Sequence, residues 1–419
     1  MTTRDALEAA LVANPDDVVL HSAYADLLIE QGDPRGEFVR LQLAAEDEAL
    51  SDDARREVND QLFDLRLRHE REWLGGLWEH LQPPPHARSY LGLQERNVSY
   101  TWRRGWIDAV SIAVLSAPLV ADLAAHPFTR LLGALSVTRN WVHDYGRDSR
   151  DQISLQPLLD SGRLATLRQF ELGQSERGIV AEGWRVDQAV RAMKRLQSIK
   201  LCVDLFSESH LFGGDYPDLH TIDITYNNPR CRFYMLGYND GLPNLRTLRL
   251  DSVSVMPDRG DLGSEREPIT DGDLQSFFRS KHLRALEYFT FRNGEFADAG
   301  VEELVASGFI GRLKGLDLSF CNITDDGALV LAAHPHVPRL EYLLLGNNLL
   351  SPVGIHALAE VGVMVSRDQL FGVPGPYDYA AEFDAQVRAE LGMDEQDDGT
   401  EVDLDGRSPD SVADDDVPF

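Results

Sequence analysis

LKGLDLSFCNITDDGALVLAAH (residues 313–334) and LEYLLLGNNLLSPVGIHALAE (residues 340–360) decide the fold of this chain. Each opens with the pattern Leu-x-x-Leu-x-Leu, in which the last two leucines share one face of a strand because side chains alternate with a period of two. An apolar stretch at helical spacing follows, and Thr324 or Asp325 and Ser351 are residue types that cap a helix. Each segment therefore predicts a strand followed by a helix.

The same pattern recurs outward from these two segments. Its first apolar residue stands at Ile107, Leu132, Leu167, Leu196, Leu219, Leu245, Leu286, Leu313 and Leu340. The successive spacings are 25, 35, 29, 23, 26, 41, 27 and 27 residues, and periods of about 20–29 residues are typical of arrays that add one strand per unit. The pattern predicts an α/β array with a parallel sheet, its three apolar positions inside and the interleaved residues outside.

The copies at 313–360 resemble the ribonuclease-inhibitor subclass of leucine-rich repeats, and the resemblance covers roughly residues 105–362. It implies a solenoid of about nine repeats over residues 91–365, with the sheet on a concave face and the helices outside. Asn140, Asn227 and Asn348 stand where the repeat's asparagine bonds neighbouring backbone, and Cys321 takes the equivalent position. The resemblance thus implies that Cys321 is a buried structural thiol.

Residues 1–90 form a predicted all-helical module. Its first helix should stop before Asn14-Pro15, because a residue preceding proline is pushed out of the helical region, and Asp16 or Asp17 can cap the next. Gly32 should end that second helix, and Asp33-Pro34 should begin a third. A longer helix is expected from about Asp52 to Leu77.

The order of these pieces resembles the bacterial repeat-companion domain, which stands before leucine-rich repeats. The resemblance spans roughly residues 5–43 and rests on Tyr24-Ala25-Asp26 and Gly32-Asp33-Pro34. It implies an architecture but no activity. Asp26 and Arg40 could suggest a catalytic pair, but we expect an ion pair between packed helices, because structural pairs outnumber catalytic ones.

Charge limits the classes of partner. The chain has 69 acidic and 40 basic residues and a formal net charge of −29, which argues against generic binding to nucleic acid or anionic lipid, since both require a basic surface. Residues 393–419 form a predicted disordered acidic tail. Residues 366–392 are predicted to form a C-terminal capping helix, with Tyr379, Phe383, Val387 and Leu391 on one stripe.

The outward positions of the strands supply the candidate binding surface, because solenoids usually bind through their concave face. Charges of both signs and aromatic residues suit protein recognition, although an ordinary polar sheet face with internal ion pairs would have the same composition. The predicted partner-binding residues are Lys200, Asp223, Tyr226, Arg249, Asp251, Tyr288, Arg292, Asp317, Phe320 and Tyr342.

Two insertions interrupt the array. The first carries apolar residues unusual for a simple loop and is predicted to be a packed lid: Phe233, Tyr234, Met235 and Tyr238. The second, at 253–270, is rich in Pro, Gly and charge and is predicted to be a mobile rim.

Catalytic and metal-binding motifs were sought without success. The three cysteines, Cys202, Cys231 and Cys321, form neither a disulfide framework nor a zinc pair, and the N-terminus turns acidic at once, so we expect a cytoplasmic protein without cofactor or metal. The first hypothesis is a non-catalytic scaffold that binds a protein partner, which the charge allows to be basic. The alternatives are a thiol-dependent enzyme or effector using Cys202 and a sensor for a small molecule or carbohydrate. The sequence gives no indication of the oligomeric state.

Overall fold

The computed structural model of the protein describes residues 2–81, 97–143, 150–174, 181, 186–203, 209–226, 233–251, 271–292 and 296–363. The chain divides into two compact units, Met1–Val373 and Pro374–Phe419, and every described residue belongs to the first. The predicted capping helix at 366–392, the predicted tail at 393–419 and the predicted rim at 253–270 lie outside the described residues.

Ten strands within the described residues form one sheet, in the order β1-β2-β3-β6-β7-β8-β9-β10-β11-β12. β1 is antiparallel to β2, and every later neighbour is parallel. The strands are β1 (Val98–Arg103), β2 (Trp106–Val114), β3 (Ala134–Arg139), β6 (Gln169–Leu172), β7 (Ser198–Val203), β8 (Thr221–Tyr226), β9 (Thr247–Asp251), β10 (Tyr288–Arg292), β11 (Gly315–Asp317) and β12 (Tyr342–Leu344). β4 (Trp141–His143) and β5 (Arg150–Gln152) form a separate hairpin.

The register of the sheet follows the sequence pattern. Leu135 of β3 pairs with Phe170 of β6, and the second apolar position of each later copy continues this row to Leu343 of β12. These side chains are buried at 5% exposure or less. The prediction of an α/β fold with a mostly parallel sheet is therefore confirmed.

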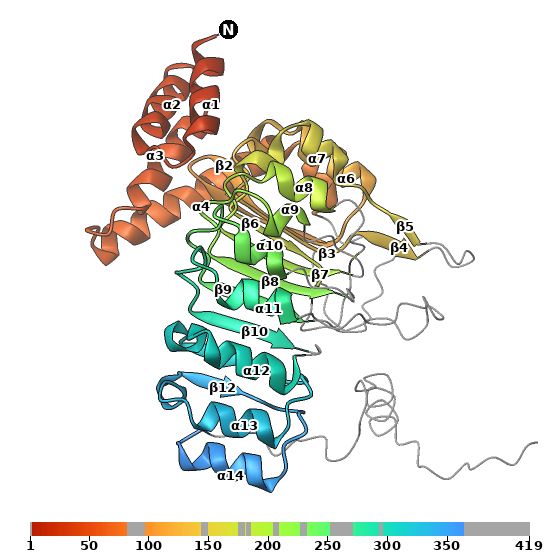
Figure 1. The fold of residues 1–419 in the computed structure, drawn as a ribbon. Helices are drawn as coiled ribbons and strands as arrows, with labels where there is room; N and C mark the ends of the chain where they lie inside the picture. The colour runs from red at the N-terminus through yellow and green to blue at the C-terminus, as the bar shows by residue number, and fades with distance from the viewer. Residues whose placement is uncertain are drawn as a thin grey trace, which may run out of the picture. The chain divides into compact units, whose positions relative to one another are not determined.

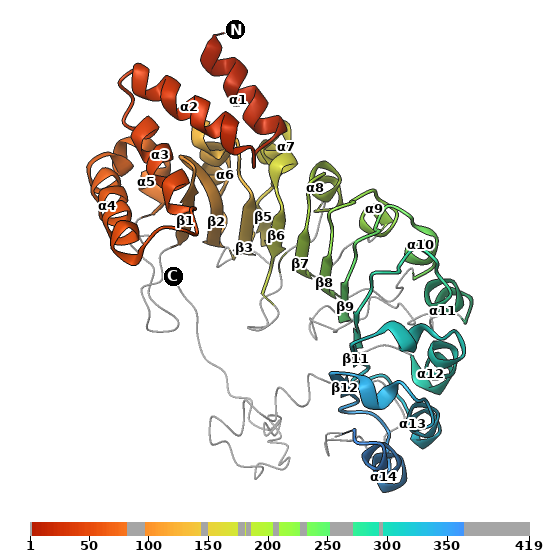
Figure 2. The ribbon, with the colours of Figure 1, turned by 90° about the vertical axis from the view of Figure 1, so that its left-hand side faces the viewer.

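Helices follow most of the strands and lie on one side of the sheet (Figures 1 and 2). They are α6 (Ala117–Ala125), α7 (Gln156–Asp160), α8 (Val186–Ala192), α9 (Ser209–Phe212), α10 (Phe233–Tyr238), α11 (Asp271–Phe278), α12 (Ala297–Ala306), α13 (Asp325–Ala332) and α14 (Pro352–Glu360). Consecutive helices from α9 to α14 pack on one another. Thr324 and Ser351 cap α13 and α14, as predicted.

Carboxylates link α12 to α13 and α13 to α14. Asp298 of α12 accepts hydrogen bonds from the backbone N–H groups of Thr324 and Gly327, at 2.9 and 3.1 Å, and from the Thr324 hydroxyl. Asp325 of α13 accepts in the same way from Ser351 and Gly354 at the start of α14. Because these N–H groups lack partners within their own helix, each acid satisfies the terminus of the following repeat.

Asn348 joins the last two repeats from the inside. Its side-chain oxygen accepts from the N–H groups of Cys321 and Ile323, and its amide donates to the carbonyls of Leu318 and Leu345, at 2.9–3.1 Å. The Cys321 thiol is fully buried and lies 3.1 Å from the Phe291 carbonyl. The predicted structural roles of Asn348 and Cys321 are confirmed, while Asn227 lies outside the described residues.

Among the described residues, five helices precede the sheet: α1 (Thr3–Ala13), α2 (Val18–Glu30), α3 (Arg35–Ala45), α4 (Asp52–Leu74) and α5 (Leu77–His80). The side chain of Asp17 caps α2, and Gly32 follows that helix with a φ of +71°. α4 ends at Leu74, before the predicted Leu77, because Gly75 adopts a φ of +49° there.

The expected ion pair between Asp26 and Arg40 is wrong. Arg40 forms hydrogen bonds and an ion pair with Glu37, three residues earlier on the same helix, and Asp26 is exposed. A contact within one helix turn replaces a contact between helices, because residues three apart already lie on the same face.

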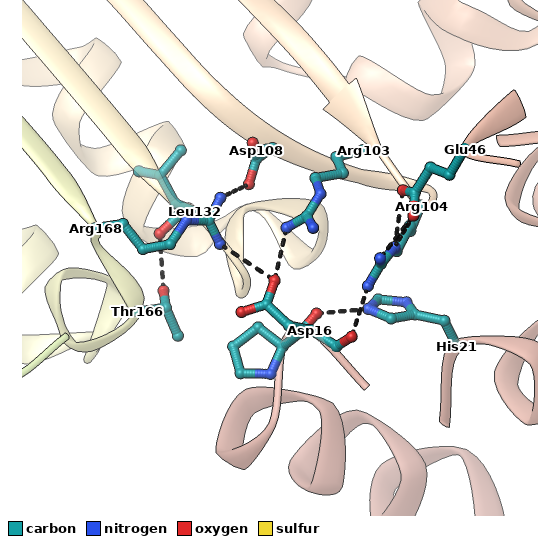
Figure 3. A network of polar contacts seen from close by, with 10 residues as sticks. Asp16, His21, Glu46, Arg103, Arg104, Asp108, Leu132, Thr166 and Arg168 are labelled. Atoms are coloured by element: carbon teal, nitrogen blue, oxygen red, sulfur yellow. Dashed lines mark hydrogen bonds and ion pairs between the residues drawn. The ribbon is translucent and has the colours of Figure 1, made fainter. Parts of the chain in front are cut away.

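A network of polar contacts joins these helices to the β1–β2 hairpin (Figure 3). Arg104, which is 5% exposed, donates to both oxygens of Glu46 and to the Asp16 carbonyl. Arg103 donates to the Asp16 carboxylate at 2.8 Å, and Arg168, next to β6, bonds Asp108 at 2.7 Å.

Arg35 is a second buried cation in this region. It is 1% exposed, its guanidinium lies 3.5 Å from the centre of the Phe128 ring, and it donates to the Gly105 carbonyl at 3.2 Å. Tyr24 and Trp106 stack beside it, with ring centres 5.5 Å apart. The N-terminal helices are therefore held to the first strands by aromatic and charged contacts together.

Candidate binding surface

One face of the sheet carries none of the described helices, and we call it the open face (Figure 2). Because the pleat alternates side chains, the residues between the buried positions of every strand point to this face. The paired residues Ser136, Glu171, Lys200, Asp223 and Arg249 form one row across β3 to β9. Asp251 and Arg292 belong to the next row along the strands.

Charges of opposite sign alternate along the open face, in a series that we call the charge ladder. Arg249 lies 3.6 Å from Asp223 and 3.9 Å from Asp251. Arg292 lies 3.6 Å from Asp251 and 3.9 Å from Asp317. Each arginine therefore sits between two carboxylates of its own or neighbouring strands.

The charge ladder extends further toward β6. Lys200 pairs in register with Glu171 on one side and with Asp223 on the other, and Glu171 accepts a hydrogen bond from the Ser136 hydroxyl at 3.0 Å. The complete ladder runs over six strands: Glu171, Lys200, Asp223, Arg249, Asp251, Arg292 and Asp317.

Aromatic side chains gather at the C-terminal end of the open face. The rings of Tyr288 and Tyr342 are nearly parallel, at 16°, with centres 6.2 Å apart. The Arg292 guanidinium lies 5.4 Å from the centre of the Phe320 ring. We call Tyr288, Phe320 and Tyr342 the aromatic platform.

The tyrosines of the platform lie in a negative environment. A hydrogen bond from the Tyr288 hydroxyl to Glu341, 2.9 Å long, raises the pKa of that phenol. Burial, and then the charge of Asp317, raise the pKa of Tyr342. Both phenols thus stay protonated at neutral pH and present uncharged ring faces.

The open face therefore does contain internal ion pairs, as the alternative interpretation of its composition requires. Surface ion pairs contribute only about 0–1 kcal/mol each to stability, so the ladder adds little to the fold. The ion pairs instead fix where each charge stands on this face of the sheet.

Most of the predicted binding residues are brought together by the sheet. Lys200, Asp223, Arg249, Asp251, Tyr288, Arg292, Asp317, Phe320 and Tyr342 belong to the charge ladder or the aromatic platform. Tyr226 ends β8, and its side chain is outside the described part of the structure. Glu341 and Gly315 belong to the same surface but were not predicted, and the signal that could have found Gly315 is its register position between two tyrosines.

The predicted lid is a helix of the outer layer. Phe233, Tyr234, Met235 and Tyr238 belong to α10, which packs on α11. Gly237 allows this packing, since a Cβ there would lie 2.4 Å from the Ser276 carbonyl oxygen. Met235 packs on the core, whereas Tyr234 and Tyr238 are exposed on the helical side. The described apolar side chains of the insertion therefore belong to the helical layer, and their role as a lid stays a prediction.

Cys202 is buried despite its outward register position. It is 3% exposed, and its carbonyl accepts from the Ala181 N–H at 2.9 Å. The backbone at Gly173 comes so close that a Cβ there would lie 2.9 Å from the Cys202 Cβ. A thiol covered in this way is poorly placed to attack a substrate. Cys231 lies outside the described residues.

The described residues offer neither a metal-binding cluster nor a membrane-spanning helix. They contain no group of three or more His, Cys, Asp or Glu side chains arranged to hold a metal ion. They also contain no helix with the length and apolar character needed to cross a bilayer.

Comparisons with known proteins show little beyond this geometry. No protein-family model matches the chain, and no curated protein matches it. Among solved structures it is similar to a structural-genomics protein from Bacteroides fragilis, at 15% identity and a TM-score of 0.32. That match covers 60% of this chain and 62% of the Bacteroides protein, so it spans under two thirds of that neighbour.

Proposed function

We propose that the chain is a non-catalytic recognition scaffold that binds a protein partner through the open face. In this proposal the strand-and-helix units are leucine-rich repeats of the ribonuclease-inhibitor type, and the open face is their concave surface. The helices α1–α5 are a repeat-companion domain that covers the first strands of the array. The protein would act in the cytoplasm.

The observation that carries the proposal is the charge ladder. Seven charged residues alternate in sign across six adjacent strands, on the face that carries none of the described helices. An enzyme needs a few groups converging on one reacting atom, whereas a long row of fixed charges ending in aromatic rings matches an extended protein surface.

The thiol-enzyme alternative has less support. Its candidate nucleophile, Cys202, is buried under the backbone near Gly173 and Ala181. Replacing Cys202 with alanine should therefore leave function intact.

The proposal is tested by capturing partners from native lysate on the immobilised full chain and on a variant with Arg249→Glu and Arg292→Glu. Both substitutions place a carboxylate between existing carboxylates, so the charge pattern of the open face is reversed locally. We expect the captured proteins to be lost with this variant and retained with Cys202→Ala.

A matched control carries the same charge change outside the open face. Arg284 is exposed and donates to the Lys281 carbonyl in the turn before β10, so Arg284→Glu should keep the captured partner. A milder double variant, Arg249→Gln and Arg292→Gln, removes both positive charges without adding negative ones. Circular dichroism shows whether each variant is folded. Loss of the partner with Cys202→Ala, or its retention by folded ladder variants, would contradict the proposal.

A further inference from the structure

The aromatic platform has a construction of its own at the β10–β12 end of the open face. Tyr288, Gly315 and Tyr342 are direct neighbours in the register of three adjacent strands. The two rings are nearly parallel, and Tyr342 is 37% exposed. A ring face is therefore accessible beside the charge ladder.

Gly315 fixes the position of the Tyr342 ring. A Cβ on Gly315 would lie 2.3 Å from Cζ and 2.7 Å from the hydroxyl oxygen of Tyr342, distances that no side chain tolerates. The ring thus lies across β11 in space that only glycine leaves open. This brings it toward Tyr288 instead of letting it stand away from the sheet.

Glu341 supplies a negative charge at the edge of the platform. Its described hydrogen bond is to the neutral hydroxyl of Tyr288, and it forms no ion pair among the described residues. The neighbouring Glu287, in contrast, is paired with Lys314 at 3.0 Å. Asp317, beneath the platform, is 8% exposed and accepts from Ser319.

Lys314, which is paired with Glu287, also interacts electrostatically with Glu341 but forms no ion pair with it. A ring face beside a carboxylate that has no ion pair of its own among the described residues is complementary to a cation. Cations bind to aromatic faces, and a guanidinium can stack on a ring while its N–H groups bond a carboxylate, which the ammonium of lysine cannot do. The same face already holds one such contact, since the Arg292 guanidinium lies over Phe320.

We propose that the aromatic platform binds an arginine side chain from an extended basic segment of the protein partner. The guanidinium stacks on Tyr342 and donates to Glu341, while Tyr288 holds that carboxylate in place. This inference rests on the proposed function and names the chemistry of the partner.

The test uses the full chain with labelled tyrosine rings and a short capped Gly/Ser peptide that carries spaced arginines. Nuclear magnetic resonance should show saturable shifts of the Tyr288 and Tyr342 signals at peptide concentrations of about 1 mM or below. A citrulline version of the peptide keeps the shape but not the charge, and it should bind at least about tenfold more weakly. Equal binding of both peptides, or no binding of the arginine peptide, would overturn the inference.

Three variants separate the parts of the site. Gly315→Ala displaces the Tyr342 ring, Tyr342→Leu removes the ring, and Glu341→Gln removes the charge. Each variant should bind the arginine peptide about tenfold more weakly. Tyr234→Leu replaces a comparably exposed tyrosine on α10 and should leave the affinity for the arginine peptide unchanged. Unchanged amide spectra away from the site show that each variant is folded, and unchanged affinity in folded variants refutes the assignment.

Two further outcomes distinguish a failure of the arginine assignment from a failure of the proposed scaffold function. Shifts of the same tyrosines with neutral oligosaccharides but not with the arginine peptide would make the platform a carbohydrate site and overturn the inference. If reversing Arg249 and Arg292 removes the captured partner while Tyr342→Leu keeps it, the arginine assignment fails and the scaffold function stands.

Discussion

Gly327 and Gly354 show what single residues contribute to the joints of the array. Neither needs a left-handed backbone; each is required for space. A Cβ on Gly327 would lie 2.4 Å from an oxygen of Asp298, and a Cβ on Gly354 would lie 2.5 Å from an oxygen of Asp325. Glycine therefore admits the carboxylate of the preceding helix to the backbone N–H groups at the start of the next one.

The first prediction concerns Gly327→Ala. The added methyl pushes the Asp298 carboxylate away from the start of α13, and losing a cap of this kind costs about 1–2 kcal/mol. Alanine improves helix propensity by about 1 kcal/mol, so the net loss in free energy of unfolding should be about 0–1 kcal/mol. Urea denaturation measures it.

Gly311→Ala is the control, because nothing lies within 4 Å of its added Cβ. Its unfolding midpoint should be unchanged or higher. A Gly327→Ala protein that is more stable than the parent would contradict the role assigned to Asp298.

At the scale of elements, the decisive contact is the one between α3 and the β1–β2 hairpin. The hairpin turns at Arg104 and Gly105, whose φ angles of +50° and +78° suit the tight turns that connect antiparallel strands. This turn directs the Arg104 side chain toward Glu46, the residue at the C-terminal cap of α3. An element at the edge of the sheet and a helix of the N-terminal group are thereby fixed to each other.

Glu46→Ala should loosen this contact. It leaves the Arg104 guanidinium, which is nearly buried, with the Asp16 carbonyl as its described acceptor, and hydrogen bonds to charged groups contribute about 1.5–3 kcal/mol. Hydrogen exchange should become faster in α2 and α3 and stay the same in α13 and α14, since repeats contact only their neighbours.

Glu37→Ala removes an acid from the same helix as a control. The Glu37–Arg40 pair is exposed, so the effect should stay below about 0.5 kcal/mol. Equal effects of Glu46→Ala and Glu37→Ala would show that the Arg104 contact does not hold the helices.

At the scale of the whole molecule, the buried His21 and the partly buried His126 make stability depend on pH. Burial lowers the pKa of His21, whose Nε2 lies 2.8 Å from the Pro15 carbonyl. Burial also lowers the pKa of His126, whose Nδ1 accepts from the Phe128 N–H while Nε2 faces the Trp73 carbonyl. Both rings are therefore neutral in the folded state.

Acidification should destabilise the protein in a defined window. The unfolded chain takes up these protons near pH 6.5 and the folded chain only at lower pH, so the free energy of unfolding falls as pH drops below 6.5. Asp16 and Glu46 also have lowered pKa values, but their contribution is lost only below about pH 4.5.

Urea midpoints at pH 7.5 and 5.5 test this dependence. Substituting His21 and His126 with glutamine should flatten it, although the double variant is less stable at pH 7.5. His356→Gln, in an exposed position on α14, should leave the dependence as it is. A parent protein with equal midpoints at the two pH values would contradict the assignment.

The repeat register was predictable because the same buried position recurs in every unit. Leu316 and Leu343 are 27 residues apart in the sequence yet pair directly in the sheet, so a spacing counted along the chain gives a position in space. The charge ladder follows from this register, and for that reason most of its members were predicted.

Contacts between residues outside the repeated sequence pattern could not be predicted. Arg104 and Glu46 are 58 residues apart and belong to elements of different kind, and nothing in their local sequence selects one for the other. The apolar residues of α10 predicted a lid because such residues are unusual in a simple loop, but the packing of this helix on α11 depends on the close approach at Gly237, which the sequence does not reveal.

The carboxylate links between helices have a consequence for how the array could grow. The unit of α13 receives a link, because the N–H groups of Thr324 and Gly327 donate to Asp298 of the preceding unit. It also provides a link, because its Asp325 accepts from the following unit. A tandem duplication of that 27-residue unit would therefore fit against itself without further change. The unit of α14 receives a link but has Pro352 where α13 has Asp325, so it has no carboxylate at that position to link a further unit in the same way.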